Sequence, residues 1–315
     1  MGAETTIRSS IIMKKVVIAG GTGFIGTELS SHYQKNGYQV FVLTRGISKV
    51  QNNIQFIHWD GTTMSSWVSV LEGAETLINL TGKSVDCRYT DTNKKLILSS
   101  RINATKILGE AINTLNNPPK LWINSSTATI YKHSLTKAMT ETNGDIGNDF
   151  SMTVAKKWEE AFYSSITPKT RKVALRISLV LGKNDGVLPV LKKLTKFGLG
   201  GHHGTGKQKF AWIHIQDLMR VFDFVSSNEN LTGSINCTSP NTITNFDFMK
   251  SLRRKLGVRI GIPTPKLLLE IGSFFLRTEP ELILKSRYVY PERLQEAGFN
   301  FQYKNMDEAL KDLIN

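Results

Sequence analysis

One glycine-rich segment near the start of the chain restricts the possible folds more than any other feature. Residues 16–26 read VVIAGGTGFIG, so a β-branched apolar run leads directly into Gly20, Gly23 and Gly26. The same stretch also fits the GxGxxG pattern from Gly21 onward. Between a strand and a helix, such glycines permit a tight turn, let a pyrophosphate approach the backbone and bring helix against strand. The segment predicts a dinucleotide site, with contacts from Gly20, Gly21, Thr22, Gly23, Phe24, Ile25 and Gly26.

Short apolar runs alternate with longer segments of helical period, which is typical of βαβ units around a parallel sheet. We therefore predict an α/β fold with a Rossmann-type, doubly wound parallel sheet and a smaller C-terminal domain on the substrate side. The expected helices are 25–35, 93–115, 150–164 and 305–314. The expected strands are 15–19, 39–44, 54–59, 76–80, 120–124, 172–181 and 234–238.

The 315 residues leave room for two units. We predict a flexible extension over residues 1–12, a dinucleotide-binding Rossmann domain over 13–235 and a smaller domain over 236–315. The alternation weakens after about residue 182, where glycine-rich sequence appears, so segments 183–215 are expected to contribute to the substrate side.

The end of the second predicted strand indicates which dinucleotide is bound. Arg45 follows Thr44 and lies 19 positions after Gly26. An acidic residue at this point would bind the ribose 2′-hydroxyl of NAD, whereas an arginine pairs with the 2′-phosphate of NADP. We therefore predict NADP(H) as the cofactor.

The combination of AGGTGFIG with LTR resembles the extended short-chain dehydrogenase/reductase superfamily. Further segments resemble its atypical YfcH-like epimerase family, whose members end in a short domain of unknown function, here about residues 262–311. These segments include INLTGKSV, SSRINAT, LRISLVLGKNDGVL, WIHIQDL, NFDFMKSL and VYPERLQEAGFNFQY. The resemblance implies further NADP(H) contacts from Thr44, Arg45, Asp60, Leu80, Thr81, Gly82, Arg101 and Val180, with Asp60 facing the adenine edge.

The superfamily's usual proton donor, a Tyr with a Lys four positions later, is missing, because none of the eight tyrosines is followed by Lys at that spacing. Alignment on the family's following Glu places Ser151 and Ala155 at the two positions. A shift by one residue places Met152 and Lys156 there instead.

A second segment, NSSTATIY, resembles the SSSATVY segment of sugar epimerases. It sets Thr127 at the serine position and Tyr131 close behind. We predict Thr127 as a hydrogen-bond donor to a substrate carbonyl and Tyr131 as an alternative proton donor. The resemblance also places Gln208 and Trp212 beside the substrate cleft.

Two other patterns are set aside. Residues 201–207 fit GxxxxGK, but Gln208 replaces the Ser or Thr that a phosphate loop requires, and a strand follows instead of a helix. His202 and His203 lack a third ligand at metal spacing, so no metal is expected.

The net charge of +14 is spread in pairs and one triplet, without a long basic block, so no nucleic-acid partner is expected. No apolar run is long enough to span a membrane, and Cys87 and Cys237 form no disulfide or zinc pattern. We expect a cytoplasmic protein that acts on a small molecule. Two functions remain open: an epimerase-like NADP(H) oxidoreductase, or a non-catalytic NADP(H)-binding protein with a redox-responsive regulatory or interaction role.

Overall fold

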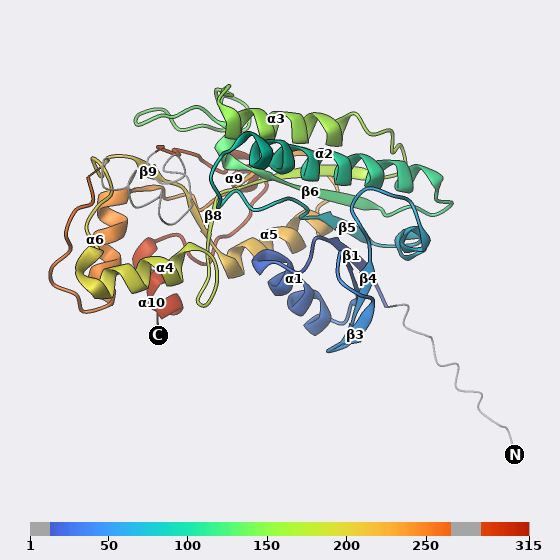
Figure 1. Cartoon of the computed structure of the whole chain (residues 1–315), viewed down its shortest axis with the longest axis horizontal. Helices are drawn as coiled ribbons and strands as arrows, with labels where there is room; N and C mark the ends of the chain where they lie inside the picture. Colours follow the sequence, from blue (N-terminus) through green and yellow to red (C-terminus); the bar gives the residue numbers. More distant parts are fainter. Residues whose placement is uncertain (1–12, 266–284, 315) are drawn as a thin grey trace, which may run out of the picture.

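The computed structural model describes residues 13–265 and 285–314 (Figure 1). The strands of its central sheet are β1 (Lys15–Ala19), β2 (Gln39–Thr44), β3 (Lys49–Gln51), β4 (Ile54–His58), β5 (Thr76–Asn79), β6 (Leu121–Thr127), β7 (Arg171–Ile177) and β11 (Gly233–Cys237). They lie in the order β11-β7-β6-β5-β1-β2-β4-β3. Every pairing is parallel except that of β3 with β4. The order reverses between β1 and β5, and such a switch point is where open α/β sheets bind ligands. The expected Rossmann-type sheet is confirmed.

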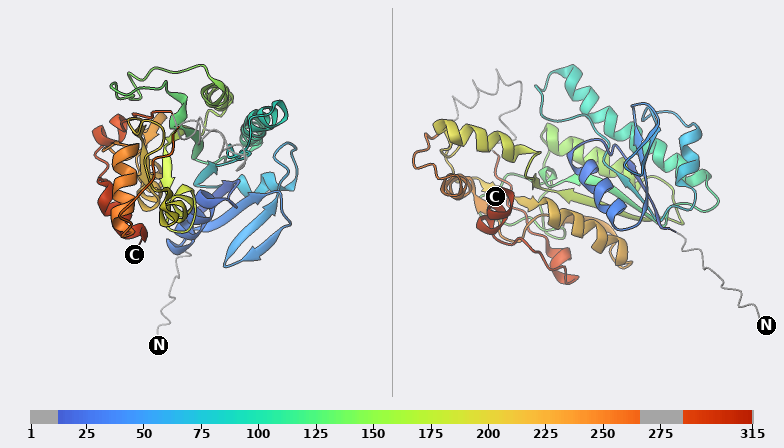
Figure 2. Two further views of the ribbon diagram at one scale, coloured as in Figure 1. Left: turned by 60° about the vertical axis from the view of Figure 1, so that its left-hand side comes forward. Right: turned by 90° about the horizontal axis from the view of Figure 1, so that it is seen from below.

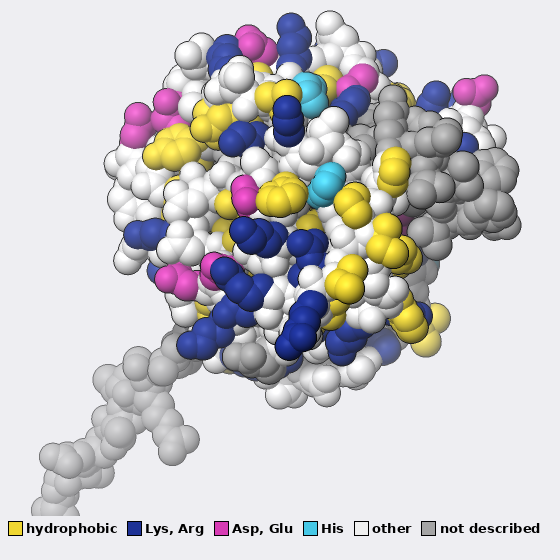
Figure 3. Space-filling model, turned by 90° about the vertical axis from the view of Figure 1, so that its left-hand side faces the viewer, with side chains coloured by type: hydrophobic (Ala, Val, Ile, Leu, Met, Phe, Trp, Pro, Cys, Tyr) yellow, Lys and Arg dark blue, Asp and Glu magenta, His cyan; other side chains and the backbone are white. Residues whose placement is uncertain are grey.

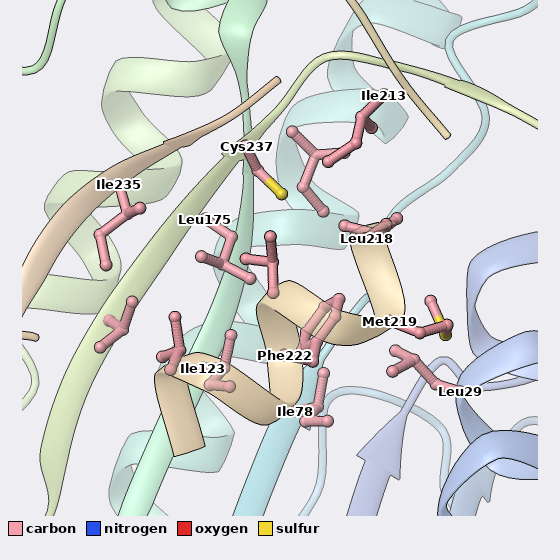
Figure 4. Close-up of a cluster of buried hydrophobic side chains, with 14 of the residues drawn as sticks. Leu29, Ile78, Ile123, Leu175, Ile213, Leu218, Met219, Phe222, Ile235 and Cys237 are labelled. Atoms are coloured by element: carbon pink, nitrogen blue, oxygen red, sulfur yellow. The ribbon is translucent and has the colours of Figure 1, made fainter. Parts of the chain in front are cut away.

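Helices cover both faces of the sheet (Figures 1 and 2). One face carries α1 (Phe24–Lys35), α5 (Ile215–Ser227) and α9 (Glu292–Glu296); the other carries α2 (Asp91–Thr114), α3 (Phe150–Tyr163) and the 3-10 turn η1 (Ser66–Leu71). Because both faces are covered, the strands are almost continuously apolar. Figure 4 shows the first of these cores, in which Leu29 of α1 and Phe222 of α5 lie over Ile78, Ile123 and Leu175 of the strands.

The predicted strand 172–181 is in fact two strands. The first, β7, ends at Ile177, and the backbone N–H of Ser178 donates to the carbonyl of Cys237. The chain then forms β8 (Leu179–Leu181), which leaves the main sheet and pairs in parallel with β10 (Trp212–His214). Most residues on both sides of the break are buried and apolar, so composition alone did not reveal it.

The remaining helices form a separate core beside the C-terminal edge of the sheet. It contains α4 (Val187–Leu194), α6 (Asn245–Lys255) and α10 (Met306–Ile314), with the small strands β9 (Lys209–Phe210) and β12 (Ile243–Thr244). The π turn η3 (Thr195–Leu199) follows α4 directly. Leu191, Phe248 and Leu310 meet in this core. Leu294 and Phe299, by contrast, pack into the first core under the sheet.

The division at residue 235 therefore stays a prediction. The third core joins α4 to helices from beyond the boundary. The predicted extension 1–12 and part of the segment 262–311 lie outside the described residues.

The face that carries α6 mixes basic and hydrophobic side chains (Figure 3). Within the described residues, no helix is both long and apolar enough to cross a membrane.

Candidate functional site

The three glycines of the first loop have different surroundings, and two of them are required by the geometry of the protein itself. Gly20 has φ +75°, and a Cβ there would lie 3.0 Å from the backbone of Thr81. A Cβ on Gly26 would lie 2.4 Å from the Cα of Gly21, so this glycine lets α1 pack against the loop. A Cβ on Gly23 would meet no atom within 4 Å. The glycine at 23 is therefore not needed for packing within the protein, and the open space in front of it suits a bound group.

The N-terminus of α1 opens onto the same space. Gly23 is its N-cap, no side chain caps the helix and its first turn contains no acidic residue. The first backbone N–H groups of a helix lack intrahelical partners and carry a partial positive charge. This end of α1 can therefore hold the pyrophosphate of a dinucleotide.

Arg45 and Asp60 follow neighbouring strands at the same edge of the sheet. Arg45 is exposed directly after β2, and its guanidinium makes no hydrogen bond or ion pair within the part of the chain that is described. Asp60 is also exposed and accepts hydrogen bonds from Thr62 and Thr63, at 2.7 and 2.8 Å from their backbone nitrogens. The Thr63 hydroxyl and these N–H groups hold the pKa of the Asp60 carboxyl well below its usual range. Both side chains lie where the adenosine end of a cofactor would extend.

A cavity of about 360 Å³ opens beyond the carboxyl ends of β5, β6 and β7. It lies between the start of α1, the loop after β5 and the helices α2 and α3. It brings together seven of the residues predicted from the sequence: Ile25, Leu80, Thr81, Gly82, Arg101, Thr127 and Val180. The cavity therefore extends from the predicted cofactor loop to the predicted catalytic threonine.

Arg101 is the most constrained charged side chain of the cavity. Its Nη1 donates to the carbonyls of Lys83 at 3.0 Å and Ile97 at 2.9 Å. The guanidinium carbon lies 5.1 Å from the ring centre of Trp158, and a Cβ on Gly82 would lie 2.8 Å from it. Burial without a carboxylate partner lowers the pKa of Arg101 to about 10, so the side chain remains charged at neutral pH.

Ser151 occupies the cavity side of α3. Its Oγ donates to the Asp149 carboxylate at 3.1 Å. Ala155, one turn later, is fully buried, and Lys156 is half-buried, with its ammonium bonded to the side chain of Asn148. Of the two alignments considered, only the one through Ser151 places a polar group at the cavity, and it provides no lysine to accompany that group.

Thr127 reaches the cavity from the end of β6. Its hydroxyl accepts the backbone N–H of Thr129 at 3.2 Å and shares a hydrogen bond of 2.7 Å with the hydroxyl of that residue. Thr127 therefore lines the cavity, and its role toward a substrate carbonyl stays a prediction.

Tyr131 lies elsewhere, which corrects the expectation that it faces a substrate. The side chain is 1% exposed, its hydroxyl donates to Asn236 Oδ1 at 2.8 Å, and it accepts from Arg176 Nη1 at 2.7 Å. It is not among the residues that line the cavity, and burial raises the pKa of its phenol. A proton donor must reach its substrate. Because the two partners come from β7 and β11, the tyrosine's burial was not visible in the local sequence.

Gln208 and Trp212 also lie away from the cavity. Gln208 is buried and donates to the His203 carbonyl at 3.0 Å; Trp212 is fully buried and donates from its indole nitrogen to the Asn241 carbonyl at 3.2 Å. Both side chains are buried and hydrogen-bonded within the protein, so packing accounts for these two residues. No three His, Cys, Asp or Glu side chains of the described segments are grouped so that they could hold a metal ion.

Residues 16–237 match the NAD dependent epimerase/dehydratase family, and residues 264–313 match a domain of unknown function, DUF1731. The chain belongs to the epimerase/dehydratase family. It is 32% identical over 304 residues to the epimerase family protein YfhF of Bacillus subtilis, covering 95% of this chain and 97% of that one. It is 30% identical over 303 residues to the human epimerase family protein SDR39U1, covering 95% of this chain and 99% of the relative.

Two solved structures share the fold of this chain. The crystal structure of human SDR39U1 (isoform 2) with NADPH has a TM-score of 0.83 and 29% identity, and the match covers 95% of this chain and 98% of that one. The UDP-N-acetylglucosamine 4-epimerase of Bacillus cereus, at 16% identity and TM-score 0.74, covers 95% of each chain and shares the fold alone.

One charged residue at the cavity was not predicted from the sequence. Lys83 lines the cavity directly after Gly82, in the loop that follows β5. Its position immediately after the predicted cofactor segment Leu80–Gly82 was the available signal.

Proposed function

We propose that this epimerase family protein binds NADP(H) and acts as an oxidoreductase on a small molecule held in the cavity. The observation that carries the proposal is the exposed, unpaired Arg45 at the end of β2, beside a helix N-terminus that has no acidic residue. An arginine there offers a charge-assisted pair to a 2′-phosphate. The human relative crystallised with NADPH supports the same choice.

The described residues fit such a cofactor. The open space in front of Gly23 would admit the pyrophosphate, Arg45 would hold the 2′-phosphate, and the cavity that Ile25 and Val180 help to line would admit the nicotinamide. When bound, NADPH would supply a hydride from its nicotinamide ring. The Thr127 hydroxyl can donate to a carbonyl oxygen, and the Ser151 hydroxyl, which donates to Asp149, borders the same cavity.

The site lacks the usual groups for proton transfer. A Tyr–Lys pair is absent, and positioned acid–base groups typically contribute about 10²–10⁴-fold to rate. Ala155 at the lysine position and Tyr131 outside the cavity favour the second candidate function, a non-catalytic NADP(H)-binding protein that responds to the redox state of its ligand.

The cofactor proposal is tested by calorimetric titration with NADPH and NADH. We expect NADPH to bind about tenfold more tightly or better, and Arg45→Ala to remove that preference. Lys35→Ala, which removes an exposed cation at the far end of α1, is the matched control and should keep it. Equal affinities in the wild-type protein, or a preference that survives Arg45→Ala, would show that the proposal is wrong.

The two functions are separated by a screen of small carbonyl compounds with NADPH. An oxidoreductase should show weak turnover that falls in Thr127→Ala. Silence across the screen with NADPH binding intact would favour the non-catalytic role. Robust turnover that survives both Thr127→Ala and Ser151→Ala would place the active site elsewhere.

A further inference from the structure

We infer that one face of the molecule docks onto a membrane surface rich in anionic phospholipids, without crossing the bilayer. The face consists of α4 with η3 (residues 187–199) and of α6 with the turn that follows it (residues 245–262), and we call it the basic face. None of its residues lines the cavity, so the inference is independent of the proposed function. Two features carry it: projecting apolar side chains, and lysines that lack a counter-charge.

The segments of the basic face meet around Gly200, which directly follows η3. The backbone N–H of Ile262 donates to the Gly198 carbonyl at 2.9 Å, and the Arg253 guanidinium of α6 donates to the Gly200 carbonyl. A Cβ on Gly261 would lie 2.7 Å from the carbonyl carbon of Gly200, so the two backbones are in direct contact. The basic face is therefore one packed surface, from which side chains project at fixed places.

Large apolar side chains are exposed on this face. Phe197 is 74% exposed and Ile260 is 76% exposed, and Val190, Phe246 and Ile262 are about half exposed. Single exposed apolar residues are ordinary, but their gathering on one face marks an interaction site. Because these side chains project from the surface, they can insert between lipid headgroups, where they would lose contact with water.

Positive charge surrounds the apolar side chains, as Figure 3 shows. The basic face contains eight Lys or Arg and one acidic residue, Asp247. Arg254 pairs with Asp307 of α10, but Lys193 and Lys196 make no hydrogen bond or ion pair with any described residue. Unpaired cations of this kind are attracted to the negative potential of an anionic leaflet.

The composition of the face favours lipid over a protein or a nucleic acid. Protein interfaces are depleted in lysine and enriched in arginine, whereas five of the eight cations here are lysines. Single-stranded nucleic acids bind through aromatic stacking, whereas Val190, Leu199, Ile260 and Ile262 are aliphatic. Lysines around projecting apolar side chains are typical of a protein that lies on a membrane surface.

Co-sedimentation of the full chain with lipid vesicles tests this inference. The probes are sucrose-loaded vesicles of phosphatidylcholine alone, and of phosphatidylcholine and phosphatidylglycerol in equal parts. We expect the protein to partition onto the mixed vesicles about tenfold more strongly than onto the neutral ones, and less strongly as salt is added.

Two double variants separate the contribution of charge from that of the apolar side chains. Lys193→Gln with Lys196→Gln should lower partitioning onto the mixed vesicles by about tenfold or more. Phe197→Ser with Ile260→Ser, which leaves the net charge unchanged, should lower it by a similar factor of about ten. Because all four side chains are exposed, both variants should unfold at the wild-type denaturant concentration.

Matched controls remove the same groups from other parts of the surface. Lys106→Gln with Lys157→Gln removes exposed cations from α2 and α3. Ile47→Ser with Val50→Ser removes exposed apolar side chains at the edge strand β3. Both controls should partition within about twofold of the wild-type protein.

Five results would overturn the inference. Three concern the vesicles: no binding to the mixed vesicles, equal binding to the neutral ones, or losses in the controls as large as those in the variants. The fourth is binding to soluble polyglutamate or to poly(U) RNA without binding to vesicles, which would assign the face to an acidic protein or to a nucleic acid. The fifth is vesicle binding that depends on Lys193 and Lys196 but not on Phe197 and Ile260, because charge alone would then explain it.

Discussion

Two arginines of this molecule lie close to the ends of the central strands, and their surroundings differ. Arg176 on β7 donates from Nε and Nη2 to the Glu159 carboxylate at 2.9 and 2.8 Å, and both side chains are about nine-tenths buried. Burial alone would lower the pKa of Arg176, but the hydrogen-bonded carboxylate more than offsets this and raises it. Arg101 on α2 has only carbonyl partners, and burial lowers its pKa.

The difference separates a structural cation from a binding cation. The charge of Arg176 is neutralised within the fold, and its third nitrogen, Nη1, donates to the Tyr131 hydroxyl. The charge of Arg101 is not neutralised by any described residue. Removing the first arginine should damage the fold, whereas removing the second should damage binding.

The largest expected effect is on stability, in Arg176→Met. Removal of one partner leaves the Glu159 carboxylate buried and unpaired, which typically costs about 3–5 kcal/mol. Arg101→Met should change the free energy of unfolding by less than about 1 kcal/mol. The two carbonyls that lose their donor lie at a cavity, and the substitution also removes the cost of burying the guanidinium charge. Denaturant unfolding of both variants measures the two values. Similar losses in both would remove the distinction between the two arginines.

Gly23→Val should act on binding with little effect on the fold. The new side chain would enter the open space where the pyrophosphate approaches the backbone. We expect NADPH affinity to fall about a hundredfold or more, which corresponds to about 2.8 kcal/mol. Gly46→Val, where a Cβ would make ordinary contact at 3.7 Å, is the matched control for adding a side chain nearby. Near wild-type affinity in Gly23→Val would contradict the interpretation of the glycine loop.

Tyr131→Phe should lower stability, as Arg176→Met does, and leave binding unchanged. It leaves Arg176 Nη1 and Asn236 Oδ1 without their shared hydroxyl, at a cost of about 1–3 kcal/mol of stability. NADPH affinity and any turnover per folded molecule should not change. Tyr163→Phe, which removes an exposed hydroxyl bonded to Ser234, should cost less than about 1 kcal/mol. If stability is unchanged and turnover is lost, Tyr131 would be a proton donor in the reaction after all.

The smallest expected effect belongs to Lys83→Met. This lysine lies in a partly exposed loop, where a charge contributes only about 0.2–1 kcal/mol. NADPH affinity should fall by about twofold to fivefold at low salt, and by less at high salt, because Lys83 contributes positive charge near an anionic cofactor. Lys95→Met on the exposed side of α2 should have no effect. A loss of NADPH affinity that does not change with salt would contradict this electrostatic role.

The sequence predicted best what depends on local geometry. The glycine spacing determines a turn over a few residues, so the loop around Gly20, Gly23 and Gly26 has the expected geometry. The alternation of short apolar runs located the seven strands of the parallel sheet, apart from the break at Ser178. The helices α4, α5 and α6 were not predicted in detail, because their burial depends on partners distant in the chain.

The catalytic side was predicted less well, because it depends on long-range packing. Thr127 reaches the cavity, but Tyr131, four residues later, is buried by Arg176 and Asn236 from 45 and 105 residues away. Gln208 and Trp212 are likewise held by the C-terminal core. Whether Arg101 has a carboxylate partner could not be determined from its own helix, since Glu159 lies on α3 and pairs with the other arginine.

The most direct test is a crystal structure of the protein with NADPH. We expect the pyrophosphate in front of Gly23, the 2′-phosphate at Arg45 and the nicotinamide in the cavity. A structure in which the 2′-phosphate lies away from Arg45, or the pyrophosphate away from Gly23, would contradict the proposed function.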